Sequence, residues 1–146
     1  MKYLKYEDVV LTPKYSTCES RSDNNTSCVL GGKEFKLPVI PANMKSVINE
    51  KICKAFSEAG YFYIMHRFGI DNFDFVETAN KEDWDLISIS IGVNLEKESE
   101  FLNKILASQL RVDYITIDIA HGHSIHMYRM IERIRAQFPH IYIIAG

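Results

Sequence analysis

Short apolar runs alternate with longer amphipathic segments along most of the chain, from about residue 38 onward. The runs begin near Val39, Tyr61, Ile87, Tyr114 and Ile141, at spacings of 22, 26, 27 and 27 residues. This even alternation is typical of βα units that build a parallel sheet. The pattern therefore predicts five strands and four intervening helices.

Four segments between the predicted strands repeat apolar residues at helical spacing on one face only. Ser46 is placed to cap the first helix and Gly60 to end it, while Ser124 and Pro139 bound the fourth. Each helix should pack one face on the sheet and turn the other to water. The predicted helices cover about residues 48–59, 71–80, 102–110 and 127–138.

Two predicted strands, 87–92 and 115–120, carry Ile at every second position and Ser, Thr, Gly, Asp or Ala between. Because side chains alternate across a strand, one face is Ile and the other is small or polar. A doubly wound sheet with helices on both faces would be apolar on both. We therefore expect an α/β barrel, with the Ile face toward the helices and the small polar face toward the barrel axis.

The first 37 residues lack this rhythm. Residues 29–35 contain Gly31-Gly32 between apolar residues, which predicts a β-hairpin. The polar stretch 19–27 before it predicts a mobile loop. We therefore divide the chain into an N-terminal loop and hairpin (1–37) and a barrel portion (38–146).

Composition excludes several classes of protein. With 17 basic and 19 acidic residues among 146, the chain lacks the basic surface that nucleic-acid binding requires. No apolar run approaches the about 18 residues that cross a bilayer, and no signal sequence opens the chain, so we expect a cytoplasmic protein. Three cysteines without CxxC spacing favour neither a disulfide framework nor a thiolate zinc site.

Polar residues follow four of the predicted strands, where α/β proteins place their functional groups. The groups are Asn43-Met44, His66-Arg67, Gly92-Val93-Asn94, and Asp118 with His121-Gly122-His123.

Asp118 is the sharpest candidate, because a carboxylate between Ile117 and Ile119 must lie at the barrel mouth or be paired. It is suited to accept hydrogen bonds from a ribose diol. Together with His121 and His123 it also suggests a hydrolytic metal site, although we favour a tight turn at Gly122.

Two other candidates also have two interpretations. Arg67 is suited to bind a phosphate or to form an ordinary surface ion pair. Met44 is suited to lie against an aromatic base or to fill the core.

Five segments resemble the IMP dehydrogenase and GMP reductase family, in its bacterial reductase branch. They include the wording Pro41-Ala42-Asn43-Met44, and they cover residues 6–13, 20–22, 37–44, 61–68 and 114–124. The resemblance implies a TIM (β/α)8 barrel, of which this chain supplies four βα units and strand five. A barrel of that kind needs about 250 residues, so we expect exposed apolar surface beside strand five.

The resemblance also implies a homotetramer that reduces GMP to IMP with NADPH and releases ammonia, as part of purine salvage. The attacking cysteine, which forms a covalent thioimidate, and a potassium-binding loop are expected beyond Gly146. Cys18, Cys28 and Cys53 do not match that nucleophile, so no catalytic residue is assigned within the chain and no resident metal is expected.

The resemblance also assigns residues of this chain to the cofactor and to the purine. Asp118, Ile119 and Ala120 match the segment at the nicotinamide and its ribose, and Arg67 matches a basic residue near the NADPH phosphates. Ser20 and Arg21 match residues that reach the cofactor from a neighbouring subunit. Asn43 and Met44 match the turn beside the purine.

Three alternatives remain open at this stage. One is the NAD-dependent oxidation of IMP by the other branch of the family. Another is a metal-dependent hydrolase that uses Asp118, His121 and His123. The third is a non-catalytic half-barrel that acts only by association.

Overall fold

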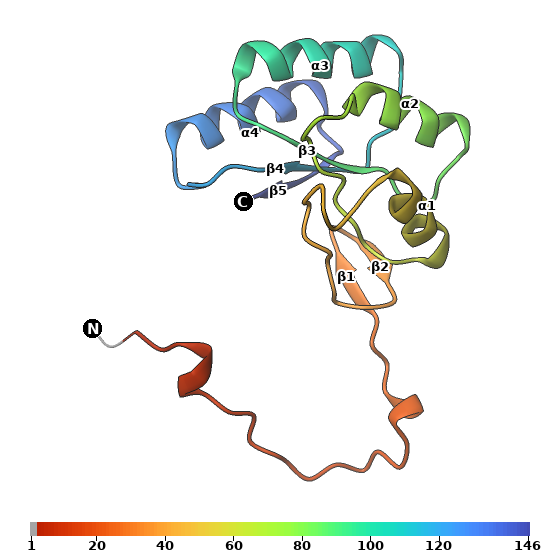
Figure 1. Cartoon of the computed structure of the whole chain (residues 1–146), viewed down its shortest axis with the longest axis vertical. Coiled ribbons are helices and arrows are strands. Elements are labelled where there is room, and N and C mark those ends of the chain that lie inside the picture. The colour runs from red at the N-terminus through yellow and green to blue at the C-terminus, as the bar shows by residue number, and fades with distance from the viewer. Residues whose placement is uncertain (1–2) are drawn as a thin grey trace.

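A computed structural model describes residues 3–146 as an N-terminal arm, a hairpin and an α/β body (Figure 1). The arm carries two 3-10 turns, η1 (Tyr6–Asp8) and η2 (Arg21–Asp23), and the hairpin pairs β1 (Cys28–Leu30) with β2 (Lys33–Phe35). The body contains α1 (Glu50–Ala59), α2 (Asn72–Lys81), β3 (Ser88–Ile91), α3 (Leu95–Ala107), β4 (Tyr114–Ile117), α4 (Ile125–Gln137) and β5 (Tyr142–Ala145).

The body is built on a parallel sheet of order β3-β4-β5, with α2, α3 and α4 on one side of it (Figure 1). Ser88, Tyr114 and Tyr142 stand opposite one another in register, as do Ile89, Ile115 and Ile143. The Tyr114 face meets the hairpin, so the Ile face is turned to the helices. The predicted α/β class and the predicted Ile face are confirmed.

Two of the five predicted strands differ in the structure. The strand predicted near Val39 is wrong, because residues 37–44 form no strand and Val39 is 63% exposed. Pro38 and Pro41 lack the N–H groups that a ladder needs, and this explains the difference. The run after Tyr61 is extended, but it pairs with β3 only through a bridge from Met65 to Ile89.

The four helices are confirmed, with two corrections at their ends. Asn49, not Ser46, caps α1 by accepting the Ile52 N–H, because residues 45–47 form a turn that delays the helix. The third helix begins already at Leu95, capped by Asn94. Gly60 and Ser124 have their predicted capping roles.

Aromatic rings join the hairpin to the sheet. The rings of Phe35 and Phe62 meet edge to face at 5.1 Å, and each also meets Tyr114. The Tyr114 hydroxyl donates to the Leu30 carbonyl at 2.6 Å. Gly31 and Gly32 both have positive φ, as the predicted turn requires. The hairpin therefore lies against the amino-terminal ends of β4 and β5.

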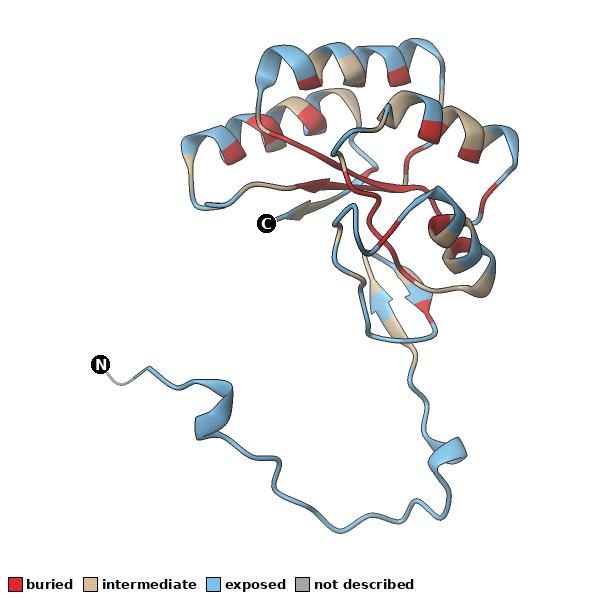
Figure 2. Cartoon of the chain, in the orientation of Figure 1, coloured by how far each residue is buried: buried red, intermediate tan, exposed pale blue. Residues whose placement is uncertain are grey.

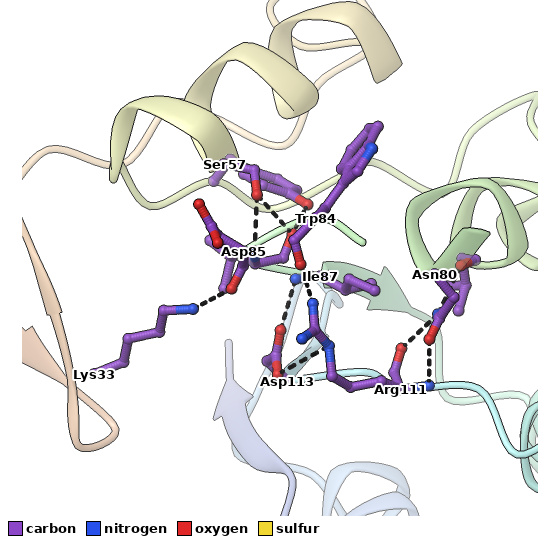
Figure 3. Close-up of polar contacts among 11 residues, drawn as sticks. Lys33, Ser57, Asn80, Trp84, Asp85, Ile87, Arg111 and Asp113 are labelled. Carbon is purple, nitrogen blue, oxygen red and sulfur yellow. Dashed lines mark hydrogen bonds and ion pairs between the residues drawn. The ribbon is translucent and has the colours of Figure 1, made fainter. Parts of the chain in front are cut away.

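A polar network binds together the amino-terminal ends of β3 and β4 (Figure 3). Asp113 accepts the Ile87 N–H at 2.7 Å and forms an ion pair with Arg111 at 3.7 Å. Asn80 holds the Arg111 backbone through two hydrogen bonds, and Arg111 in turn donates to the Trp84 carbonyl. These contacts fix the strands at the edge opposite the predicted site.

The arm extends away from the body and is exposed along its length (Figure 2). Its large apolar side chains include Tyr6 and Leu11, each 98% exposed, and Tyr15 at 94%. At the other end of the chain, β5 is a half-exposed edge strand, as expected of the surface beside strand five. No helix within residues 3–146 has the length and apolarity to cross a bilayer.

Candidate functional site

Arg67 and Asp118 meet at the carboxyl end of the sheet. Arg67 Nε lies 3.4 Å from Asp118 Oδ2, and Arg67 Nη2 donates to the Asp118 carbonyl oxygen at 3.2 Å. The first contact is an ion pair outside hydrogen-bond geometry, since Nε makes no hydrogen bond. The guanidinium therefore contacts both the side chain and the backbone of Asp118.

The parallel register brings these two residues together. Asp118 directly follows β4, and its N–H donates to the Ile91 carbonyl of β3 at 2.8 Å. Arg67 comes two residues after Met65, which bridges to β3 from the other side. The chain thus leaves β3, β4 and the extended segment before Arg67 at the same edge of the sheet, as parallel βα units require.

The pair is partly open to solvent, with side-chain exposures of 32% for Arg67 and 31% for Asp118. The guanidinium also lies over the Phe68 ring, with Cζ 4.6 Å from the centroid. A cation held by a carboxylate and an aromatic face keeps a defined orientation while its remaining N–H groups stay available. This arrangement is suited to bind an anionic oxygen.

A cavity of ≈ 300 Å³ adjoins the pair between the starts of α2 and α3. Arg67, Lys97 and Lys104 supply cationic groups to its wall, Asp71, Glu98 and Glu100 supply carboxyl groups, and Phe73 and Phe101 supply apolar ones. The volume lies at the lower end of the range for small-molecule sites. The cavity can hold part of a phosphate-bearing ligand while that ligand contacts Arg67.

His66 is oriented away from solvent and is only 2% exposed. Its Nδ1 accepts the Phe68 N–H at 3.2 Å, which shapes the turn that presents Arg67. Burial lowers the pKa of His66, and the charge of Lys45 lowers it further. A neutral imidazole therefore acts here as a structural acceptor.

The other predicted cofactor and substrate residues are more exposed. Ile119 is half-buried and Ala120 is exposed, directly after Asp118. Asn43 is half-buried and Met44 is exposed, in the segment before α1. Residues 43 and 44 thus lie in an irregular segment rather than at the end of a strand.

Ser20 and Arg21 lie at η2 on the arm, which extends away from the α/β body that carries Arg67 and Asp118 (Figure 1). Ser20 caps the short turn η2, and its N–H donates to Asp23. The structure does not bring these two residues to the site within one chain.

The histidines after β4 do not form a metal centre with Asp118. His121, His123 and His126 are exposed. The His123 and Tyr128 rings meet edge to face, with their centroids 6.4 Å apart. Nowhere in residues 3–146 do three His, Cys, Asp or Glu side chains come together to hold a metal ion. The hydrolase alternative has no support from this geometry.

None of the cysteines has the surroundings of a nucleophile. Cys53 is buried in α1 beside Met65, and burial raises its pKa to about 12. Cys18 lies on the exposed arm, and Cys28 contacts the Leu37 carbonyl at 3.5 Å. A thiol with a raised pKa is a poor nucleophile.

Sequence reasoning identified Arg67 and Asp118 separately but not their contact, and it did not single out Glu98, whose Oε1 accepts the Gly92 N–H at 3.1 Å next to Arg67. Both residues follow predicted strands. Because parallel strands end at the same edge of a sheet, this was the signal that the two residues lie close together. The carboxylate of Glu98 had no such signal, because it lies on the first turn of α3, where acidic residues are common.

Comparison with known proteins defines the class to which this fold and site belong. The family model for the IMP dehydrogenase / GMP reductase domain matches residues 3–146. The chain therefore belongs to the IMP dehydrogenase/GMP reductase family.

Similar curated proteins share one name. The chain is 46% identical to the GMP reductase of Helicobacter pylori over 147 residues, and 42% identical to that of Acidovorax ebreus over 146. It is 48% identical to the GMP reductase of Oceanobacillus iheyensis over 143 residues. The matches cover 97% to 100% of this chain but only 43% to 44% of these relatives. The predicted resemblance is confirmed.

Proposed function

We propose that this chain carries the cofactor side of an enzyme that reduces GMP to IMP with NADPH and releases ammonia. The GMP reductase relatives support the reaction, and the meeting of Arg67 with Asp118 is the observation that supports the site. The parallel βα units support the further proposal that the chain is part of a (β/α)8 barrel.

The donors and acceptors at the site fit a dinucleotide. Arg67 offers N–H groups to a phosphate oxygen, and Lys97 and Lys104 line the same cavity together with the acidic residues Asp71, Glu98 and Glu100. Asp118 offers acceptor oxygens to ribose hydroxyls. Ile119 and Ala120, which follow it in the chain, are the residues that we assign to the nicotinamide. NADPH, when bound, supplies the hydride.

The reaction needs groups beyond those described. At C2 of the purine the C–N bond would break as a C–S bond to the cysteine forms, and the amino group would leave with the thiol proton as ammonia. Hydride would then form the new C–H bond at C2 as the C–S bond breaks, and the released thiolate would regain a proton. The covalent thioimidate in this proposal requires an activated cysteine, which Cys18, Cys28 and Cys53 do not provide. We assign that step, and a potassium loop, to residues outside this chain. The 146 residues alone should therefore be inactive.

Assembly explains the position of the arm. An extended arm with exposed Tyr6, Leu11 and Tyr15 needs a protein surface to cover it. In a homotetramer, this arm would carry Ser20 and Arg21 to the cofactor of a neighbouring subunit. Asn43 and Met44 would lie beside the purine of their own subunit.

The test is an assay of the native polypeptide that contains these residues, purified from its source. We expect loss of NADPH absorbance with GMP and formation of IMP and ammonia. Oxidation of IMP with NAD, without reduction of GMP, would instead assign the chain to the dehydrogenase branch. Failure to bind NADPH even when assembled would remove the roles given to Asp118 and Arg67.

A further inference from the structure

Glu98 is a buried carboxylate beside the site, and the proposed function does not use it. Its residue is 8% exposed, and its Oε1 accepts the Gly92 N–H at 3.1 Å. No ion pair forms with it among residues 3–146. The same residue lines the cavity beside Arg67, so its hydrogen bond to Gly92 lies between α3 and the site.

Gly92 is the point where Glu98 and Arg67 converge. A Cβ on Gly92 would lie 3.1 Å from Glu98 Oε1, 3.5 Å from Arg67 Nη1 and 3.7 Å from Arg67 Cζ. No positive φ is required at Gly92. Its lack of a side chain therefore leaves space for the Glu98 carboxyl and the Arg67 guanidinium beside the segment that leaves β3.

These contacts form a chain of support from α3 to the site. Glu98 is anchored on the first full turn of α3, which begins at the Asn94 cap. It holds the Gly92 N–H, the position that a Gly92 Cβ would fill lies 3.5 Å from Arg67 Nη1, and Arg67 Nε lies 3.4 Å from Asp118 Oδ2. A shift of Gly92 would therefore change the space next to the Arg67 guanidinium.

We propose that Glu98 is a positioning residue, which holds Gly92 beside the Arg67 guanidinium and so sets the geometry of the Arg67–Asp118 pair. Its functional consequence, on dinucleotide affinity, rests on the proposed cofactor role of that pair. The positioning itself does not.

The direct readout is the side-chain Nε–H resonance of Arg67 in ¹H–¹⁵N TROSY NMR spectra of the native assembled protein, assigned by its loss in Arg67→Lys. Glu98→Gln keeps an acceptor oxygen for the Gly92 N–H, whereas Glu98→Ala removes it. Glu100→Ala is the matched control, because Glu100 lies on α3 at the same cavity but is exposed and does not contact Gly92.

We expect Glu98→Ala to shift the Arg67 resonance and to speed its exchange with water, and Glu98→Gln and Glu100→Ala to leave both near wild type. Gly92→Ala, which keeps Glu98 but adds a methyl group beside the Arg67 guanidinium, should shift the same resonance. An unchanged resonance in Glu98→Ala, or an equal change in Glu100→Ala, would overturn the proposal. Unchanged backbone resonances of β5 show in each case that the fold is intact.

The second readout is NADPH affinity, measured by fluorescence in the native assembled protein. Misplacing a ligand-contacting group by a fraction of an ångström has large effects, so Glu98→Ala should weaken NADPH binding by roughly tenfold and Glu98→Gln by less than about twofold. If the wild type does not bind NADPH, the proposed function fails while the Arg67 resonance still decides the positioning. If NADPH binding is present and indifferent to Glu98→Ala, the effect of Glu98 on dinucleotide affinity is overturned, while the proposed function stands.

Discussion

Arg67 contacts Asp118 twice, through Nε at 3.4 Å from the carboxylate and through Nη2 at 3.2 Å from the carbonyl oxygen. The two residues are 51 positions apart in the sequence. Only the second contact survives loss of the carboxylate charge, so the side-chain and backbone parts of the relationship can be separated by mutation.

Asp118→Asn should weaken NADPH binding while leaving stability nearly unchanged. A hydrogen bond to a charged group contributes about 1.5–3 kcal/mol, so the dissociation constant should rise by about tenfold or more. The ion pair is one-third exposed, so the free energy of unfolding should fall by about 1 kcal/mol or less. Fluorescence titration of the assembled protein and urea unfolding measure the two effects.

Glu77→Gln is the control for that variant. It breaks the exposed Glu77–Lys81 pair on α2, which lies within one helix and outside the cavity beside Arg67. Equal losses of NADPH affinity in the two variants would contradict a specific role for Asp118.

Asp113→Ala should destabilise the sheet. The substitution leaves the Ile87 N–H without its acceptor at 2.7 Å and leaves Arg111 without its ion-pair partner. An unsatisfied buried donor costs about 1–3 kcal/mol, and this loss should appear in the free energy of unfolding in urea. The neighbouring Asp85→Ala is the control, because Asp85 is exposed and contributes only its backbone carbonyl, to Lys33. It should cost less than about 0.5 kcal/mol; a reversed order would show that the network of Figure 3 does not hold the strands.

Gly31→Ala and Gly69→Ala separate backbone strain from steric clash. Both glycines have positive φ, at 56° and 68°. A Cβ on Gly31 would lie 2.6 Å from Tyr142 Cγ, whereas one on Gly69 meets only the flexible end of Lys45 at 3.5 Å. Strain alone costs about 1–2 kcal/mol, and overpacking adds about 1–3 kcal/mol. Thermal unfolding should therefore show a clearly larger loss for Gly31→Ala, and equal losses would refute the packing of the hairpin on Tyr142.

His66 should make stability depend on pH. Its pKa is lowered in the folded state from the ordinary value of 6.5 by burial and by Lys45, so the unfolded chain takes up the proton first as the pH falls. Stability should therefore decrease from pH 7 to pH 5. The loss should be smaller in His66→Asn, whose side-chain oxygen can still accept the Phe68 N–H. Urea unfolding at both pH values, with the exposed His126→Asn as control, measures the difference; parallel pH profiles for wild type and His66→Asn would contradict it.

The sequence pattern predicted the parts of the fold that depend on local periodicity. Strands β3 and β4 follow from their alternating Ile, and α4 follows from its apolar stripe and the Ser124 cap. The run at Val39 has the same apolar content, but its flanking prolines prevent pairing. The cap of α1 moved to Asn49 because the turn at 45–47 depends on backbone contacts that composition does not reveal.

The candidate site was predicted as separate positions rather than as an arrangement. Arg67 and Asp118 were both predicted from their positions after apolar runs. Their contact, however, depends on the register of β4 and of the segment before Arg67 relative to β3. Glu98 was not predicted, because acidic residues are common at the start of a helix and its hydrogen bond to Gly92 leaves no pattern in the sequence.

The central claim is that Arg67 and Asp118 form part of the NADPH site of a GMP-reducing enzyme. Its most direct test is the assay of NADPH consumption with GMP by the native polypeptide, compared with the same polypeptide carrying Asp118→Asn. We predict IMP and ammonia in equal amounts from the wild type, and a rise of about tenfold or more in the KM for NADPH in the variant. Absence of GMP reduction by the wild type, or an unchanged KM in the variant, would contradict the account.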